Sequence, residues 1–348
     1  MSNLDRHPDE AVLERGRPCN AVEVLEPRLV PLGGPRAMTV HRTLPQRERS
    51  MVGAWCFLDH YGPDHVAATG GMRVPRHPHT GLATVSWLFT GDIDHLDSAG
   101  NAAVVRPGEL NLMFAGRGIT HSEFSTPDTE VLHGVQLWFA LPDATRFSAP
   151  GLTHFVPDPV EAPGLTARVF IGELLGSRSP VDTRTGELLG AELRIDPDRS
   201  VTLDVRADFE HAVLAVTGTV AVDGTPVAHR GLGSAPPGAA SLTLTAGHGG
   251  ARIILLGGVP FDEQIVMWWN FVGRTHDEIV EFRRRYQAEI GVDARGGAPD
   301  AGAGDDRDAA LFGPFPEGQP LPLPAPELPT VRLRPRDRGG AAATPSDG

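Results

Sequence analysis

Two short pairs of possible metal ligands stand out in the sequence, His77-Pro78-His79 and His121-Ser122-Glu123. A β-strand points alternate side chains to the same face, so each pair can direct both of its side chains into one interior. Three neutral nitrogens and one anionic oxygen suit Fe, Ni, Cu or Zn better than Mg or Ca, which prefer all-oxygen shells. An octahedral metal would keep two positions open for water, substrate or dioxygen. The spacing favours a metal site over the alternative, which is structural or solvent-facing histidines.

Strands are the elements that must position these pairs. From about residue 21 to Pro142, short apolar runs alternate with Gly, Pro and Asp turns, as at 82–89 and 131–141. This pattern is typical of an antiparallel barrel or sandwich and not of βαβ units.

A second β-rich region is predicted beyond a linker at about 143–163, where Pro and Gly become frequent. Its strands are predicted at 191–195, 200–205, 212–216, 219–222, 241–245 and 252–256. This region contains no His-x-His pair. Its histidines, His211, His229 and His248, lie far apart and are interpreted as solvent-facing or satisfied within the core.

One helix is predicted near the end of the folded region. Residues 275–278 (THDE) form a capping box, in which the Thr hydroxyl and the Glu carboxylate each accept a backbone N–H. Four apolar residues then share one face, and Gly291 can end the helix; they are Ile279, Phe282, Tyr286 and Ile290. The apolar face predicts packing against a barrel, with a partner-binding groove as the alternative.

Composition narrows the class of protein. The formal net charge of -13 argues against a nonspecific nucleic-acid binder. Two cysteines, Cys19 and Cys56, do not make a disulfide framework. No run approaches the ~20 apolar residues of a membrane span, and the first residues lack the apolar stretch of a secretory signal. We therefore expect a cytoplasmic protein that contacts neither membrane nor nucleic acid directly.

Several runs of the sequence resemble the pirin family, which belongs to the cupin superfamily of small β-barrels. They are FLDHYGP at 57–63, HPHTG at 77–81, GDIDHLDSAGN at 91–101, RPGELNLMFAGRGITHSE at 106–123 and HGVQLWFALP at 133–142. The likeness extends over roughly residues 20–290. It implies an all-β bicupin, with two antiparallel β-barrel domains of the double-stranded β-helix or jelly-roll type, a C-terminal helix and a disordered tail.

The resemblance and the composition together divide the chain into five parts. Residues 1–20 are expected to form a flexible arm, 21–145 a metal-binding cupin domain and 146–165 a linker. Residues 166–292 would form a second cupin domain that lacks a metal site and ends in the helix. Residues 293–348, rich in Gly, Ala and Pro, are predicted to be disordered because they cannot bury enough apolar area. A proline-rich stretch there leaves a proline-recognition partner open.

The same resemblance implies a site and an activity. Its ligands would be His77, His79, His121 and Glu123, holding one Fe2+ per chain, with Ni, Cu, Mn or Zn as other candidates. The implied enzyme is an iron-dependent dioxygenase similar to quercetin 2,3-dioxygenase, which opens a flavonol or similar enolisable molecule with O2 and uses Glu123 as general base. The family also supports a different class of function, a non-enzymatic redox-responsive regulator whose metal state controls binding to a protein partner.

The surroundings of the site are predicted less specifically. Ala83 stands where family members often carry a glutamate, which predicts the loss of an outer contact to the site. Phe57, Met72, Phe114 and Trp138 are candidates for the pocket wall or, equally, for the barrel core.

Overall fold

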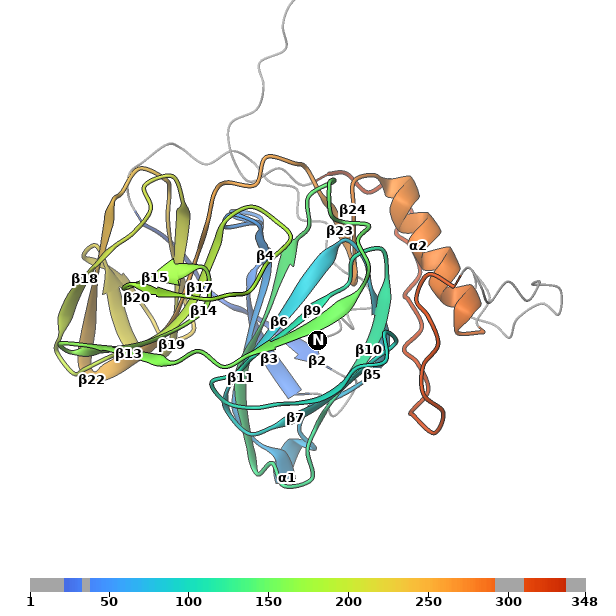
Figure 1. Cartoon of the computed structure of the whole chain (residues 1–348), viewed down its shortest axis with the longest axis horizontal. Helices are drawn as coiled ribbons and strands as arrows, with labels where there is room; N and C mark the ends of the chain where they lie inside the picture. The colour runs from blue at the N-terminus through green and yellow to red at the C-terminus, as the bar shows by residue number, and fades with distance from the viewer. Residues whose placement is uncertain (1–21, 33–37, 292–309, 336–348) are drawn as a thin grey trace, which may run out of the picture.

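The computed structural model describes residues 22–32, 38–291 and 310–335 (Figure 1). Cys19 and the predicted N-terminal arm lie outside these ranges. Two domains, both built mostly of strands, lie side by side, and α2 (His276–Glu289) flanks the first of them. Neither helix in the described ranges has the length and hydropathy required to span a lipid bilayer.

The first domain consists of two facing antiparallel sheets. One sheet contains, in spatial order, β12 (Gly151–Phe155), β9 (Leu110–Phe114), β6 (Leu82–Thr90), β11 (Val131–Ala140), β4 (Trp55–His65), β3 (Met38–Leu44) and β2 (Arg28–Leu32). The other contains β5 (Arg73–His79), β10 (Ile119–Ser125), β7 (Ile93–Asp97) and β8 (Ala102–Val105), and a single turn, α1 (Val66–Thr69), follows β4. The predicted all-β jelly-roll is confirmed as a double-sheet sandwich, since the described strands do not close into a barrel.

The second domain is built on one strongly curved sheet. Its order is β1 (Glu23–Leu25), β21 (Leu232–Ala235), β19 (Glu210–Val222), β22 (Ser241–Gly258), β17 (Leu188–Ile195), β14 (Leu165–Ile171) and β13 (Pro159–Ala162). Two further strands join it, β18 (Ser200–Asp204) on β22 and β20 (Thr225–Val227) on β19. Two short hairpins form separate two-stranded sheets, β15 (Glu173–Leu174) with β16 (Ser177–Arg178) and β23 (Val266–Trp268) with β24 (Phe271–Gly273).

Two pairs of predicted strands in this domain are in fact continuous. The strands expected at 212–216 and 219–222 form β19, and those at 241–245 and 252–256 form β22. Gly218 and Gly250 adopt φ values of 75° and 71°, and a Cβ on Gly218 would lie 2.1 Å from the Gly250 carbonyl oxygen. Because glycine permits both the conformation and the close approach, each strand bends without ending.

The predicted linker is not structureless. Within it, β12 pairs with β9 of the first domain, and β13 pairs with β14 of the second. Edge strands of both sheets therefore come from a segment whose Pro and Gly content indicated a loop.

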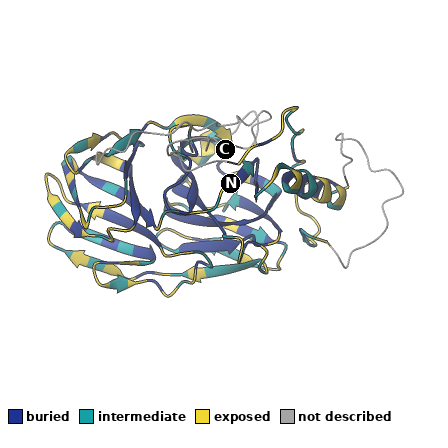
Figure 2. Cartoon of the chain, turned by 90° about the horizontal axis from the view of Figure 1, so that it is seen from above, coloured by how far each residue is buried: buried dark blue, intermediate teal, exposed yellow. Residues whose placement is uncertain are grey.

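An apolar cluster shared by both domains holds them together. It includes Trp55, Trp87 and Phe139 of the first domain and Phe170 and Leu256 of the second. The Trp55 indole lies 3.2 Å from the carbonyl oxygens of both Leu189 and Gly257. Figure 2 shows buried strands continuing across the boundary, so the two domains pack as one unit.

Both ends of the described chain cross the expected domain boundary. Strand β1 belongs to the sheet of the second domain, although the sequence assigned its residues to the first. Conversely, residues 310–335 lie against β5, β10 and α2. Leu323 N donates to the Arg76 carbonyl oxygen at 2.8 Å, and Tyr286 Oη donates to the Leu323 carbonyl oxygen at 2.7 Å. The predicted disordered tail thus contains a packed segment, while residues 292–309 and 336–348 lie outside the described ranges.

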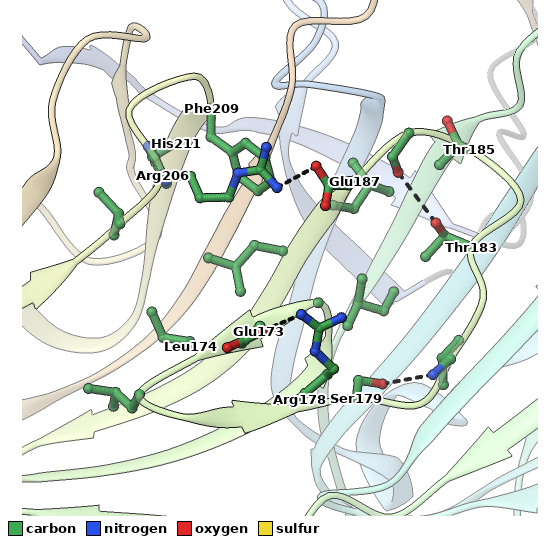
Figure 3. Close-up of a pocket in the computed structure, with 18 of the residues that line it drawn as sticks. Glu173, Leu174, Arg178, Ser179, Thr183, Thr185, Glu187, Arg206, Phe209 and His211 are labelled. Carbon is green, nitrogen blue, oxygen red and sulfur yellow. Dashed lines mark hydrogen bonds and ion pairs between the residues drawn. The ribbon is translucent and has the colours of Figure 1, made fainter.

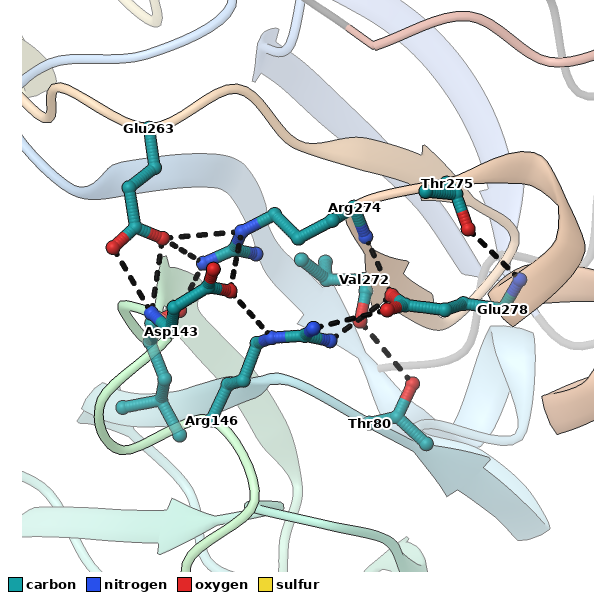
Figure 4. A network of polar contacts seen from close by, with 9 residues as sticks. Thr80, Asp143, Arg146, Glu263, Val272, Arg274, Thr275 and Glu278 are labelled. Carbon is teal, nitrogen blue, oxygen red and sulfur yellow. Dashed lines mark hydrogen bonds and ion pairs between the residues drawn. The ribbon is translucent and has the colours of Figure 1, made fainter.

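The N-terminus of helix α2 has the predicted threonine cap, but the capping glutamate has different partners from those predicted. Thr275 Oγ1 accepts the Glu278 N–H at 3.2 Å, which confirms the N-cap. The Glu278 carboxylate instead accepts Arg274 N at 2.7 Å and both guanidinium ends of Arg146, at 2.9 and 3.0 Å (Figure 4). Arg146 also donates to Asp143, so the capping glutamate anchors the helix to the segment that follows β11. Ile279, Phe282 and Tyr286 are buried, which confirms the predicted packing face.

A cluster of histidines at the domain boundary predicts acid sensitivity. Nε2 of His60 and Nε2 of His133 lie 2.9 Å apart, so at most one of them can carry a proton. Burial lowers the pKa of His60 well below its usual range and that of His133 to about 4. Arg230, Arg252, His41 and His229 lie close by and also disfavour protonation, whereas Asp59 favours it at His41.

Because these pKa values lie below those in the unfolded chain, the two histidines do not affect stability near pH 7, where they are neutral in both states. As the pH falls from 6.5 towards 4, the unfolded chain binds protons that the folded protein does not, and the free energy of unfolding declines. We expect metal-free protein to have a lower free energy of unfolding at pH 5 than at pH 7, and the difference to shrink in His133→Gln. Urea unfolding at both pH values measures this. An equal decline in wild type and variant would contradict a role for the pair.

Candidate metal centre

The two predicted ligand pairs lie on adjacent strands of the first domain. Strands β5 and β10 pair antiparallel, with His121 opposite His77 and Ile119 opposite His79. All three imidazoles are fully buried, and their ring centroids are 4.3 to 5.1 Å apart. The register of the pairing therefore brings together side chains that are distant in the sequence.

The histidine nitrogens have the orientation and charge of metal ligands. His77 Nδ1 donates to the Pro75 carbonyl oxygen at 2.9 Å, which places the lone pair on Nε2. Nε2 of His77, His79 and His121 is buried without a hydrogen-bond partner among the described residues. Burial lowers the pKa of His77 to about 3 and those of His79 and His121 well below the usual range. Neutral, converging imidazoles with unpartnered nitrogens fit a transition metal.

Glu123 lies beside this triad, in a second group of possible ligands that also contains His121. Ligand atoms of His77, His79 and His121 all lie within 4.8 Å of one another, and so do those of His95, His121 and Glu123. The Ser86 hydroxyl lies 3.3 Å from Glu123 Oε1 and 2.9 Å from Gln136 Oε1. With the Gln136 amide turned over, its Nε2 donates to Ser86 and the hydroxyl can donate to Glu123. Strands β6 and β11 thereby support the carboxylate from the facing sheet.

His95 and Asp97 complete a chain of contacts behind His121; the sequence predicted for His95 an outer or strand-turn hydrogen bond without a ligand role, and it did not single out Asp97. His121 Nδ1 lies 3.5 Å from His95 Nδ1, and His95 Nε2 lies 3.3 Å from Asp97 Oδ2. The only tautomers that satisfy both contacts have N–H at His121 Nδ1 and His95 Nε2, which leaves His121 Nε2 free to bind a metal. Asp97 is held by N–H groups of Ala99 and Asn101 at 2.9 to 3.0 Å. The signal was present in the sequence as a third alternating pair, His-x-Asp.

This arrangement predicts that His95 governs metal affinity without acting as a primary ligand. We expect His95→Leu to weaken metal binding by about 10- to 100-fold, the range typical for outer partners of a ligand. His95→Asn should restore much of the affinity, because its amide can occupy the place of Nδ1. Chelator competition measures both constants. Equal affinity in wild type and His95→Leu would contradict the assignment.

The four side chains proposed for the pocket wall occupy different places. Trp138 packs edge-on against His79, with ring centroids 5.0 Å apart, and stacks on Phe57 at 3.9 Å. Phe114 lies in the apolar cluster between the domains, and Met72 lies in a separate cluster with Tyr61. Of these four side chains, Trp138 is therefore the one in ring contact with a predicted ligand.

The prediction for Ala83 is wrong in its geometry. Ala83 is fully buried in the apolar cluster between the domains. Side chains alternate along β6, so Ser86 points to the face opposite to that of Ala83 and towards Glu123. An outer contact to the metal site is thus supplied by Ser86, and the residue at 83 belongs to the interdomain core.

A glycine allows the sharp turn that follows the first ligand pair. Gly81 has φ 67°, and a Cβ there would lie 2.3 Å from the Val272 carbonyl oxygen. Val272 N also donates to the Thr80 carbonyl oxygen at 3.1 Å. The segment after β23 is therefore pressed directly against the end of β5, which fixes the strand that carries His77 and His79.

The three histidines of the second domain do not assemble. His248 is exposed and pairs with Asp198, and His229 is exposed near the domain boundary. His211 is buried, and its Nε2 has no hydrogen-bond partner in the described part of the chain. It is neither solvent-facing nor satisfied, contrary to the sequence interpretation.

Comparisons with known proteins agree with this architecture. The Pirin family model matches residues 37–139, which include all the ligand candidates, and the Pirin C-terminal cupin domain model matches residues 190–290. A protein of Pseudomonas aeruginosa named "Putative quercetin 2,3-dioxygenase" is 38% identical over 328 residues, covering 92% of this chain and 98% of the relative. The chain belongs to the pirin family.

Other pirin relatives extend the comparison. A pirin-like protein of Caulobacter vibrioides is 35% identical over 262 residues, covering 72% of this chain and 88% of the relative. The crystal structure of a quercetin 2,3-dioxygenase from Acinetobacter baumannii superposes with a TM-score of 0.79 at 34% identity, covering 90% of this chain and 98% of that one. The two-domain pirin architecture is therefore shared over nearly the whole length.

Proposed function

We propose that this pirin is a metal-dependent dioxygenase that opens a flavonol or similar enolisable small molecule with O2. The observation that carries the proposal is the set of three buried, neutral imidazoles whose ligand atoms converge and whose Nε2 atoms are unpartnered among the described residues, with Glu123 grouped with His121. Relatives that carry the quercetin 2,3-dioxygenase name support the substrate class. Fe2+ is the proposed metal, and His77, His79, His121 and Glu123 are its proposed ligands.

A bound transition metal would supply a Lewis acid with open positions and the electron transfer needed for reaction with O2. The chain's own residues do the rest. The imidazoles are held neutral by burial, so each presents a lone pair. Contacts with Pro75 and His95 set which nitrogen does so in His77 and His121, respectively. Glu123 would accept the proton of the substrate hydroxyl, with Ser86 orienting the carboxylate.

The environment of the metal centre excludes bulk water. His77, His79 and His121 have no exposed surface, and Glu123 is only 1% exposed. Trp138 and Phe57 provide an apolar wall beside His79. A carboxylate in such a site interacts strongly with a nearby proton or cation, because the local dielectric is low.

The proposal is tested by supplying quercetin to protein reconstituted with Fe2+ and measuring O2 uptake and carbon monoxide release, with metal content determined in parallel. Turnover that requires the metal would support the dioxygenase. Fully loaded protein that consumes no O2 with quercetin would exclude this flavonol as substrate. Metal-free protein and protein loaded with Zn2+, which has no redox chemistry, serve as matched controls.

A further inference from the structure

A cavity lies in the domain that lacks the metal ligands. It has a volume of about 540 Å³ and opens at the surface between the β15–β16 hairpin, the loop that follows it and the beginning of β19 (Figure 3). None of the residues that line it belongs to the metal centre. The volume is within the range of small-molecule sites.

The inner wall of the cavity is apolar. Ile171, Leu174, Leu189 and Phe209 contribute to it, and each is at most 5% exposed. His211 lies near the start of β19, two residues after Phe209, and the two ring centroids are 6.0 Å apart. The cavity therefore offers apolar contact area with one imidazole at its base.

The charged groups around the cavity disfavour anions. Arg178 pairs with Glu173, and Arg206 pairs with both Glu187 and Asp208, so both arginines on the rim are already neutralised. Asp182 and Asp204 add further negative charge to the lining. An anionic ligand would meet repulsion, whereas a neutral one would not.

His211 supplies a directional contact. Its Nε2 is buried without a hydrogen-bond partner among the described residues. Burial lowers its pKa to about 4, so near neutral pH the ring is uncharged and has one nitrogen able to accept a hydrogen bond. The His211 ring lies beside Phe209, on which the Arg206 guanidinium stacks at 4.5 Å.

We propose that this cavity is a second ligand site, which binds a small neutral ring compound through apolar contacts and a ring hydroxyl that donates to His211. The site is independent of the metal centre and of the proposed dioxygenase activity. A half-buried threonine on the loop at its mouth, Thr185, allows the cavity to be filled without altering the core.

Phenol, anisole and benzoate are suitable probes, used with metal-free protein in an NMR titration. Phenol should bind at one saturable site, more tightly than anisole, which lacks the hydroxyl donor, and than benzoate, which is anionic. Thr185→Trp should weaken phenol binding at least tenfold, whereas Thr153→Trp, a matched change on β12 of the first domain, should not. His211→Leu should abolish the preference for phenol over anisole.

Several results would overturn the proposal. They are the absence of saturable phenol binding at millimolar concentration, unchanged binding in a folded Thr185→Trp variant, and equal affinity for phenol and anisole in the wild type. Circular dichroism establishes that each variant is folded. If Thr185→Trp fails to fold, the phenol and anisole comparison in His211→Leu still decides the outcome.

Discussion

Replacing His121 by alanine is expected to weaken metal binding by more than about 100-fold, beyond the range typical for an outer partner of a ligand. His121 belongs to both groups of converging ligand atoms, so its loss leaves neither group with three members. The fold should persist, because Nε2 of His121 has no hydrogen-bond partner among the described residues and the change breaks only the 3.5 Å contact of Nδ1 with His95. Metal content after reconstitution and circular dichroism measure the two effects.

The matched control for this variant is His248→Ala, which removes an exposed histidine of the second domain. We expect it to load metal as the wild type does. Full metal retention by a folded His121→Ala protein would show that the metal binds elsewhere, and it would remove the basis of the proposed function.

Glu123→Gln is expected to lower turnover per bound metal by about 10²- to 10⁴-fold, the usual contribution of a general base. The amide keeps the size of the carboxylate and its contact with Ser86. It cannot accept a proton from a substrate hydroxyl, and it also provides a weaker, uncharged oxygen ligand. The measurement is the initial rate of O2 uptake with quercetin, divided by the metal content of the same sample.

Glu130→Gln, at an exposed position before β11, is the control and should match the wild type. Two outcomes separate the roles of Glu123. Low metal content with normal turnover per metal would assign it to binding alone, whereas normal metal content with low turnover would assign it to proton transfer. Unchanged content and unchanged turnover would contradict both roles.

Local patterns in the sequence determined much of this protein. Alternating apolar residues with Gly and Pro turns predicted strands such as those at 82–89 and 131–141, which the structure places in β6 and β11. The helix was predicted by its threonine cap and its apolar face. His-x-His and His-x-Glu predicted pairs of ligands for the same kind of reason, because the two-residue period of a strand places both side chains of a pair on one face.

Contacts between distant segments were decided only by the tertiary structure. Strand β1 precedes the first domain in the sequence but pairs with the sheet of the second. Residues 310–335 follow the second domain in the sequence but pack on the first. Ala83 and Ser86 differ in function because alternate faces of β6 meet different partners, an apolar cluster on one side and Glu123 on the other. The sequence likewise did not predict that His211 would have an unpartnered nitrogen and line a cavity.

The sequence by itself therefore determined which residues could hold a metal, since ligand chemistry and the strand period are local properties. The tertiary structure decided how they meet. The antiparallel register of β5 and β10 places His121 opposite His77, and the pairing of β7 with β10 brings His95 and Asp97 behind it. No hairpin turn joins β5 to β10 and fixes their register, so it depends on the packing of both sheets around a common core.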